Sequence, residues 1–204
     1  MHKILENIFL PFNPHVAIAP AERLRYAKQE SIQSDVRPNA EWENIMGFKI
    51  ADLKGKTVLD LGGVIGGESE QVFKNNQVNI IPLNIVAKDK SQRGIRALAQ
   101  QLPLSDNSCD VVFSYGAIPG YLEHSIAEIK AVLEESMRVL KPGEQAYFYP
   151  ITEFWITSEL KDMLNSIASI DTCDFKELGE CQYWNAKSSK QLWVKVFRLV
   201  LKKK

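Results

Sequence analysis

The pattern of hydrophobic and polar positions changes near residue 56. Beyond this point short apolar runs alternate with amphipathic stretches, which predicts strands alternating with helices. The predicted strands are residues 57–61, 78–83, 95–99, 111–114, 145–149 and 194–201. The predicted helices are residues 68–75, 126–140 and 158–168. This alternation is typical of an α/β domain in which helices cover both faces of a mostly parallel sheet.

Two of the predicted helices carry sequence signals at their ends. Pro142 and Gly143 follow the helix at 126–140 and are expected to stop it. Ser158 stands at the start of the helix at 158–168, where its hydroxyl is expected to serve as the N-cap. Both signals concern the ends of helices and do not depend on any ligand.

The first fifty residues differ from the rest of the chain. Helical stretches are expected there at residues 21–33 and around 40–46. Prolines are also frequent in this part, at Pro11, Pro14, Pro20 and Pro38. The sequence therefore predicts a helical cap or lid at residues 1–50, followed by an α/β domain at residues 51–204.

Composition and charge narrow the range of partners. The 204 residues include 25 basic and 25 acidic side chains, so no net charge attracts nucleic acid, and binding to nucleic acid is not expected. The apolar runs are too short to cross a membrane, and residues 1–12 do not resemble a secretory signal. The three cysteines, Cys109, Cys173 and Cys181, lack metal-ligand spacing and are odd in number, which favours the cytoplasm and no metal site.

A glycine-rich turn carries the strongest chemical signal in the sequence. An apolar strand opens into a helix through Val58-Leu59-Asp60-Leu61-Gly62-Gly63-Val64-Ile65-Gly66-Gly67-Glu68. Glycines allow the backbone to turn tightly and to approach a ligand, and the first amides of the helix face the same space. Tight packing of the strand against the helix explains the same glycines without a ligand. The turn by itself leaves both interpretations open.

Several segments, in order, resemble the class I S-adenosylmethionine-dependent methyltransferases over roughly residues 56–150. Leu59-Asp60-Leu61-Gly62 is similar to the first motif of that family. Residues 102–112 resemble the segment that leads into the family's fourth strand, with Cys109 where an aromatic residue is usual. Leu122-Glu123-His124 and Arg138-Val139-Leu140-Lys141-Pro142-Gly143 are similar to the motifs after the fourth strand and before the fifth. The resemblance implies a three-layer Rossmann-like fold, with a mostly parallel sheet and an antiparallel last strand. It also implies S-adenosylmethionine as the cofactor and a small-molecule acceptor, and it leaves the oligomeric state open.

The resemblance also implies which positions bind the cofactor. They are Asp60, Gly62, Gly63, Gly66, Asn84, Leu98, Ala99 and Tyr115. Three positions depart from the family pattern. Val64 replaces a glycine, Asn84 replaces the acidic residue that holds the ribose, and Leu98 replaces an aspartate that often bonds the adenine. Asn84 can still bond a hydroxyl, and backbone near Ala99 would have to contact the adenine.

These departures support two hypotheses about function. The first is methyl transfer from S-adenosylmethionine to a small or medium-sized acceptor. The second is a methyltransferase fold that has lost catalysis and acts as a binding or scaffold module. A nicotinamide-dependent oxidoreductase is a weaker third hypothesis, because it gives no role to residues 102–112 and 138–143.

A few side chains outside the cofactor positions are candidates for chemistry. His124 is the candidate general base, since an imidazole titrates near neutral pH, and its alternative role is to order the start of a helix. Trp42 and Trp155 are candidates for an apolar acceptor pocket, with core packing as the alternative. Lys202-Lys203-Lys204 is expected to be a solvated tail.

Overall fold

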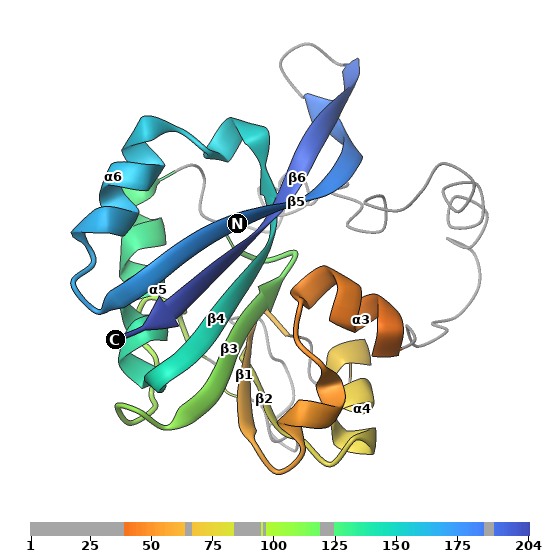
Figure 1. Cartoon of the computed structure of the whole chain (residues 1–204), viewed down its shortest axis with the longest axis vertical. Helices are drawn as coiled ribbons and strands as arrows, with labels where there is room; N and C mark the ends of the chain where they lie inside the picture. The colour runs from red at the N-terminus through yellow and green to blue at the C-terminus, as the bar shows by residue number, and fades with distance from the viewer. Residues whose placement is uncertain (1–38, 64–66, 84–94, 96, 119–124, 186–189) are drawn as a thin grey trace.

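The computed structural model contains one six-stranded sheet (Figure 1). It describes residues 39–63, 67–83, 95, 97–118, 125–185 and 190–204. At residues 181–185 and 190–192 it describes the backbone alone. In sheet order the strands are β2 (Asn79–Leu83), β1 (Thr57–Leu61), β3 (Cys109–Tyr115), β4 (Leu140–Thr152), β6 (Lys190–Lys203) and β5 (Ile170–Asn185). The first four run parallel, and β6 runs antiparallel to both of its neighbours. The predicted fold, a mostly parallel sheet with an antiparallel last strand, is confirmed.

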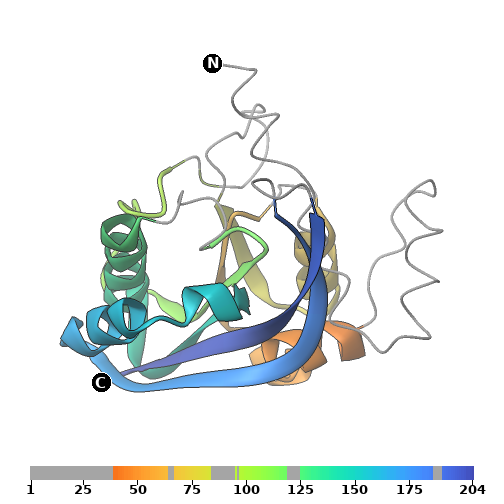
Figure 2. The ribbon, with the colours of Figure 1, turned by 90° about the horizontal axis from the view of Figure 1, so that it is seen from above.

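Helices cover both faces of the sheet, which makes three layers (Figure 2). The helices α3 (Asn39–Met46) and α4 (Glu68–Asn75) lie on one face, and α5 (Ile126–Val139) and α6 (Ser158–Ser166) lie on the other. Strand β3 shows why both faces are needed. Its Val111 and Phe113 enter the core under α3 and α4, whereas Val112 enters the core under α5 and α6. A strand that is apolar at every position is stable only when both of its faces are covered.

The predicted third strand, residues 95–99, is wrong. Among the described residues of this segment, 95 and 97–101, Ile95 alone pairs with the sheet, as an isolated parallel bridge to Leu83, and no strand is present at 97–101. The Ile95 amide donates to the Pro82 carbonyl at 2.9 Å. Residues 98–101 form a turn instead of an extended strand, because the Gln101 amide donates to the Leu98 carbonyl at 3.1 Å.

Of the two predicted helix signals, the stop before Pro142 agrees with the structure and the N-cap at Ser158 is corrected. Helix α5 ends at Val139, before Pro142 and Gly143, which lie within β4 where its pairing with β3 is irregular. A proline is tolerated at such an interruption because no ladder bond is required of it. The N-cap of α6 is Thr157 and not Ser158, because Thr157 has extended backbone and its hydroxyl accepts from the Leu160 amide at 3.2 Å.

The C-terminal part of the sheet is longer than predicted. Strand β5 was not expected, since its polar sequence lacks a clear apolar period, and it forms the edge of the sheet by pairing along β6. The Lys202–Lys204 segment is not a solvated tail. Lys203 lies in β6, and its ammonium donates to the Leu140 carbonyl and the Asn107 side chain, both at 2.7 Å.

The described part of the predicted cap packs into the main core. Trp42 of α3 is 3% exposed and contacts Phe73 and Phe113 edge to face. Arg198 of β6 donates to the Ile45 carbonyl at 3.0 Å, which ties the end of α3 to the sheet. The helix expected at 21–33 lies outside the described residues, and the division at residue 50 stays a prediction. No helix of the described chain has the length and apolar character needed to span a membrane.

Candidate active site

The candidate site lies at the carboxyl edge of the parallel strands, where α/β sheets bind their ligands. Strand β1 ends there at Leu61, and the next residue, Gly62, has a φ of +89°. The Gly62 amide donates to the Leu83 carbonyl of β2 at 2.8 Å. A Cβ atom at Gly62 would overlap the side chain of Ala117, which follows β3. Glycine is therefore required at this position by both the backbone conformation and the packing.

Asp60 and Gly63 form the inner side of the same turn. A Cβ atom at Gly63 would overlap the Asp60 carboxyl group, and the Gly63 amide donates to the Asp60 carbonyl at 3.3 Å. Both glycines therefore have a packing role within the protein, as the ligand-free interpretation of the turn requires. That role leaves the turn tight enough for its backbone to approach a ligand.

The Asp60 carboxyl group is buried and lacks a cationic partner among the described residues. It is 3% exposed, and Ser69 of α4 donates to its Oδ2 at 2.5 Å. Burial raises the pKa of Asp60 to about 7, and the Ser69 hydrogen bond opposes this shift. Asp60 is thus a carboxyl group that can gain or lose a proton near neutral pH when its surroundings change.

Ser114 connects the ends of β1 and β3 and was not predicted. Its hydroxyl donates to the Leu61 carbonyl and accepts from the Ile118 amide, both at 3.0 Å. The side chain is completely buried, so both bonds are needed to satisfy it. A serine near the end of an otherwise apolar strand is the one signal from which Ser114 could have been found.

Tyr115 reaches the carboxyl edge on the α3 side of the sheet. Its ring lies 5.1 Å from Trp42 and 5.7 Å from Tyr149, measured between centroids. The structure therefore places the two tryptophan candidates on different faces. Trp42 belongs to the core under α3 and α4, while Trp155 packs against the core under α5 and α6, so the two cannot line one pocket.

Leu98 and Ala99 lie in the segment that replaces the third strand. Leu98 is 51% exposed, and its carbonyl accepts from the Gln101 amide at 3.1 Å. Ala99 is partly buried against the core under α5. The exposed Leu98 side chain offers an apolar surface, but no acceptor or donor, to a ligand at this edge.

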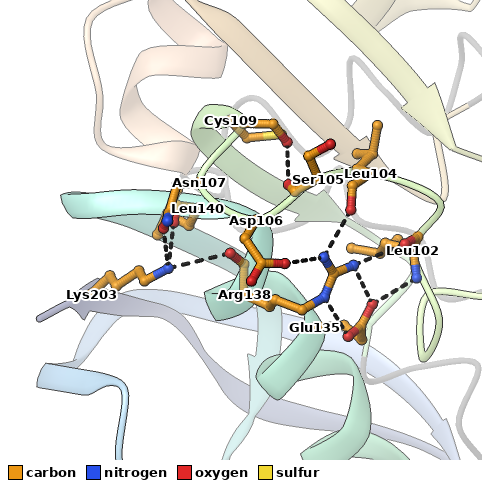
Figure 3. A network of polar contacts seen from close by, with 11 residues as sticks. Leu102, Leu104, Ser105, Asp106, Asn107, Cys109, Glu135, Arg138, Leu140 and Lys203 are labelled. Carbon is orange, nitrogen blue, oxygen red and sulfur yellow. Dashed lines mark hydrogen bonds and ion pairs between the residues drawn. The ribbon is translucent and has the colours of Figure 1, made fainter.

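Arg138 of α5 fixes the other end of this segment (Figure 3). Its guanidinium donates to the carbonyls of Leu102 at 2.9 Å and Leu104 at 2.8 Å. It also bonds both carboxylate oxygens of Glu135 and one of Asp106, so that all five of its N–H donors are used. Glu135 in turn accepts from the Leu102 amide at 2.8 Å. The motif that resembles the family's segment before the fifth strand thus has a structural task here.

Four positions singled out in the sequence lie outside the described residues. They are Val64, Gly66, Asn84 and His124. Of the predicted cofactor positions, the structure brings Asp60, Gly62 and Gly63 together in one turn. Tyr115 lies at the same edge, and Leu98 and Ala99 follow the end of β2.

Comparison with known proteins finds similarity to methyltransferases. A family model described as a methyltransferase domain matches residues 59–148. The chain is 27% identical over 152 residues to a sterol 24-C-methyltransferase of Gibberella zeae, an alignment that covers 68% of this chain. It spans only 37% of the length of that relative.

Two solved structures share the fold. A S-adenosylmethionine-dependent methyltransferase from Archaeoglobus fulgidus superposes with a TM-score of 0.56 and 14% identity, over 88% of this chain and 99% of the other. A TehB-like methyltransferase from Corynebacterium glutamicum gives a TM-score of 0.52 and 14% identity, over 90% and 97% of the two chains. The match over residues 59–148 and the shared fold make this chain similar to S-adenosylmethionine-dependent methyltransferases, and the glycine turn at the end of β1 lies inside the matched residues.

Proposed function

We propose that this chain transfers a methyl group from S-adenosylmethionine to a small or medium-sized acceptor. The observation that carries the proposal is the turn of Asp60, Gly62 and Gly63 at the carboxyl end of β1, inside the matched methyltransferase domain. When bound, the cofactor supplies an electrophilic methyl group on a sulfonium. The protein accelerates such a displacement mainly by holding the two reactants in line.

Each predicted position has a proposed task in this reaction. Gly62 and Gly63 let the backbone approach the cofactor, with Gly66 continuing the turn and Asn84 bonding the ribose. The segment at Leu98 and Ala99 lies on the adenine side, and Tyr115 forms part of the wall near the transferred methyl. His124 would accept a proton from the acceptor. These tasks follow from the family resemblance and from the edge of the sheet to which the described members belong.

The acceptor is proposed to be a small molecule. The name of the Gibberella zeae relative indicates a sterol as its acceptor. For this chain the relative supports a small organic acceptor without identifying it. We also place the protein in the cytoplasm, which the cysteine pattern favours.

Isothermal titration with S-adenosylmethionine and with S-adenosylhomocysteine tests the proposal. We expect saturable binding of both at one site, and weaker binding in a Gly63→Ala variant, since the added Cβ displaces Asp60. Gly179→Ala is the control for a strained alanine remote from the turn, because Gly179 lies in β5 with a positive φ and open space around its Cβ position, and its ligand affinity should equal that of the wild type. Absence of binding by folded wild-type protein at millimolar ligand would overturn the proposal.

The second candidate function is a catalytically inactive binding or scaffold module. Two observations favour it: the third strand is reduced to one bridge at Ile95, and Leu98 presents an apolar side chain where a polar contact to adenine is common. This candidate predicts no binding of either ligand. Substituting Val64→Gly, Asn84→Asp and Leu98→Asp together should then create binding, whereas an active enzyme binds without these changes.

A further inference from the structure

The order of the strands in the sheet reverses between β1 and β3. From β1 the chain continues through α4 to β2 on one side, and from β3 it continues through α5 to β4 on the other side. In open α/β sheets, ligands bind outside the carboxyl ends of the two strands at such a switch point. The two segments that border this position are the glycine turn after β1 and the residues that follow β3.

Strand β3 separates from β1 at this point while it stays paired with β4. The register of β3 with β1 ends at Phe113, whereas that of β3 with β4 continues to Tyr115. The Gly116 amide then donates to the Tyr149 carbonyl of β4 at 2.7 Å. The backbone of the segment after β3 is therefore attached to β4, and its register with β1 ends one residue before Ser114.

The Ser114 side chain links the two strands where their register ends. Its hydroxyl donates to the Leu61 carbonyl at the end of β1 and accepts from the Ile118 amide, both at 3.0 Å. One oxygen atom therefore joins the last residue of β1 to the segment after β3. Ser114 is completely buried, so both backbone groups would lose their partner without gaining access to water if the hydroxyl were removed.

A packing contact holds the same two segments at close range. Ala117 lies against Gly62, where a Cβ atom would overlap the Ala117 side chain. On its other side, the Gly62 amide donates to the Leu83 carbonyl of β2. The backbone of the glycine turn is therefore confined between β2 and Ala117, and the Ser114 hydroxyl is the polar link that holds Ala117 in place. A shift of the segment after β3 would move Ala117 away from Gly62 and release the turn.

We propose that Ser114 is a positioning residue for the cofactor, and that its hydroxyl fixes the glycine turn relative to the segment after β3. The inference rests on the proposed methyl transfer and adds a residue to the binding machinery. Ser114 is completely buried, so it acts through Leu61 and Ile118 and not by touching the ligand. A displacement of about 1 Å in either segment is enough to weaken a binding site strongly.

Isothermal titration of the full chain with S-adenosylhomocysteine tests this inference. Ser114→Ala should weaken the affinity of the folded protein about tenfold. Ser114→Cys keeps the shape of the side chain but is a weaker donor and acceptor, so its affinity should lie between those of Ser114→Ala and the wild type. Ser136→Ala is the matched control, because Ser136 of α5 is also completely buried and its hydroxyl donates to the Val132 carbonyl at 2.7 Å. Its affinity should equal that of the wild type.

Hydrogen exchange in the absence of ligand gives a second measurement of the same link. The Gly62 amide should exchange faster in Ser114→Ala than in the wild type, because the turn is released. In Ser136→Ala its exchange rate should equal that of the wild type. An unchanged rate in Ser114→Ala would contradict the proposed link between Ser114 and the turn.

Two results of the titration would overturn the inference while methyl transfer stands. One is wild-type affinity in folded Ser114→Ala, or in Ser114→Cys where the alanine variant does not fold, which would make Ser114 a purely structural residue. The other is an equal loss of affinity in Ser114→Ala and Ser136→Ala, which would assign the effect to the loss of any buried hydroxyl. Absence of binding by the folded wild type would instead overturn the proposed methyl transfer, and the inference with it. The two failures are therefore distinguishable.

Discussion

The two edges of the same parallel sheet are built in opposite ways. At the amino edge, charged side chains bind the starts of the strands together. Lys141 of β4 bonds Asp110 of β3 at 2.6 Å, and Asp110 accepts from the Thr57 amide of β1 at 2.8 Å. Burial alone would raise the pKa of Asp110, but these two hydrogen bonds bring it below its usual value. Arg138 and Lys203 extend the network to α5 and β6 (Figure 3).

At the carboxyl edge, the described residues include the buried carboxyl group of Asp60 and the glycine turn that follows β1. Asp60 is held by a serine rather than by a cation, and its pKa is raised where that of Asp110 is lowered. The amino edge has satisfied its charges within the protein, so it has little left to offer a ligand. At the carboxyl edge, the partner of the buried Asp60 carboxyl group among the described residues is the neutral Ser69 hydroxyl. We therefore expect the amino edge to contribute chiefly to stability and the carboxyl edge to ligand binding.

The largest effect is expected from Gly62→Ala at the carboxyl edge. The positive φ costs about 1 to 2 kcal/mol for a residue with a Cβ atom, and the overlap with Ala117 costs about 1 to 3 kcal/mol more. Chemical denaturation should show this loss of unfolding free energy together with loss of S-adenosylhomocysteine binding. Gly55→Ala shares the positive φ, at +75°, without the overlap, so a loss of stability equal to that of Gly62→Ala would contradict the packing argument.

Arg138→Met should have the next largest effect, and on stability alone. It leaves the Glu135 carboxylate and two backbone carbonyls without their donor, and we expect a loss of about 2 to 3 kcal/mol. Lys130→Met on the same helix removes only an exposed pair with Glu134 and should cost less than about 0.5 kcal/mol. Cofactor affinity, measured by titration, should change little in either variant. A strong loss of affinity in Arg138→Met would show that the two edges are not separate in function.

Asp60→Asn should change how stability depends on pH. The folded-state pKa lies above the unfolded value, so the folded protein retains the proton while the unfolded chain releases it. The contribution of Asp60 is therefore fully present below about pH 4 and is lost as the pH rises to about 7. We expect the free energy of unfolding of Asp60→Asn, relative to that of the wild type, to be about 1 to 2 kcal/mol higher at pH 8 than at pH 5. Chemical denaturation at the two pH values measures this difference. An unchanged difference between the two proteins would mean that Asp60 titrates as an ordinary exposed carboxyl group.

Lys203→Met should have the smallest effect of the four. Its ammonium bonds the Asn107 side chain and two carbonyls in a partly exposed position, and its loss should cost about 0.5 to 1.5 kcal/mol. Lys204→Met, one residue further along the chain, should be neutral because Lys204 is exposed at the end of the chain. Equal melting temperatures of the two variants would mean that Lys203 behaves as a solvated side chain.

Local patterns in the sequence were sufficient for most of the elements. The helix at 68–75 and the strand at 57–61 have the predicted bounds, because an amphipathic stripe and an apolar run are properties of neighbouring residues. Strand β5 could not be found in this way, since a polar edge strand is stabilised by its partner β6 and not by its own pattern. The same limit explains why Ser69 and Ser114 were missed, whereas Asp60, Gly62 and Gly63 were named. Gly66, Asn84 and His124 stay predictions.

The sequence by itself determined the bounds of strand β1 and helix α4, the glycines of the β1 turn and the resemblance to the methyltransferase family. These features depend on residue type and on spacing along the chain. Only the tertiary structure decided that residues 98–101 form a turn, that Arg138 uses all five donors, and that Asp60 is buried with Ser69 as its hydrogen-bond partner. Hydrogen-bond partners and burial depend on distances between segments far apart in the chain, and a local pattern does not contain those distances.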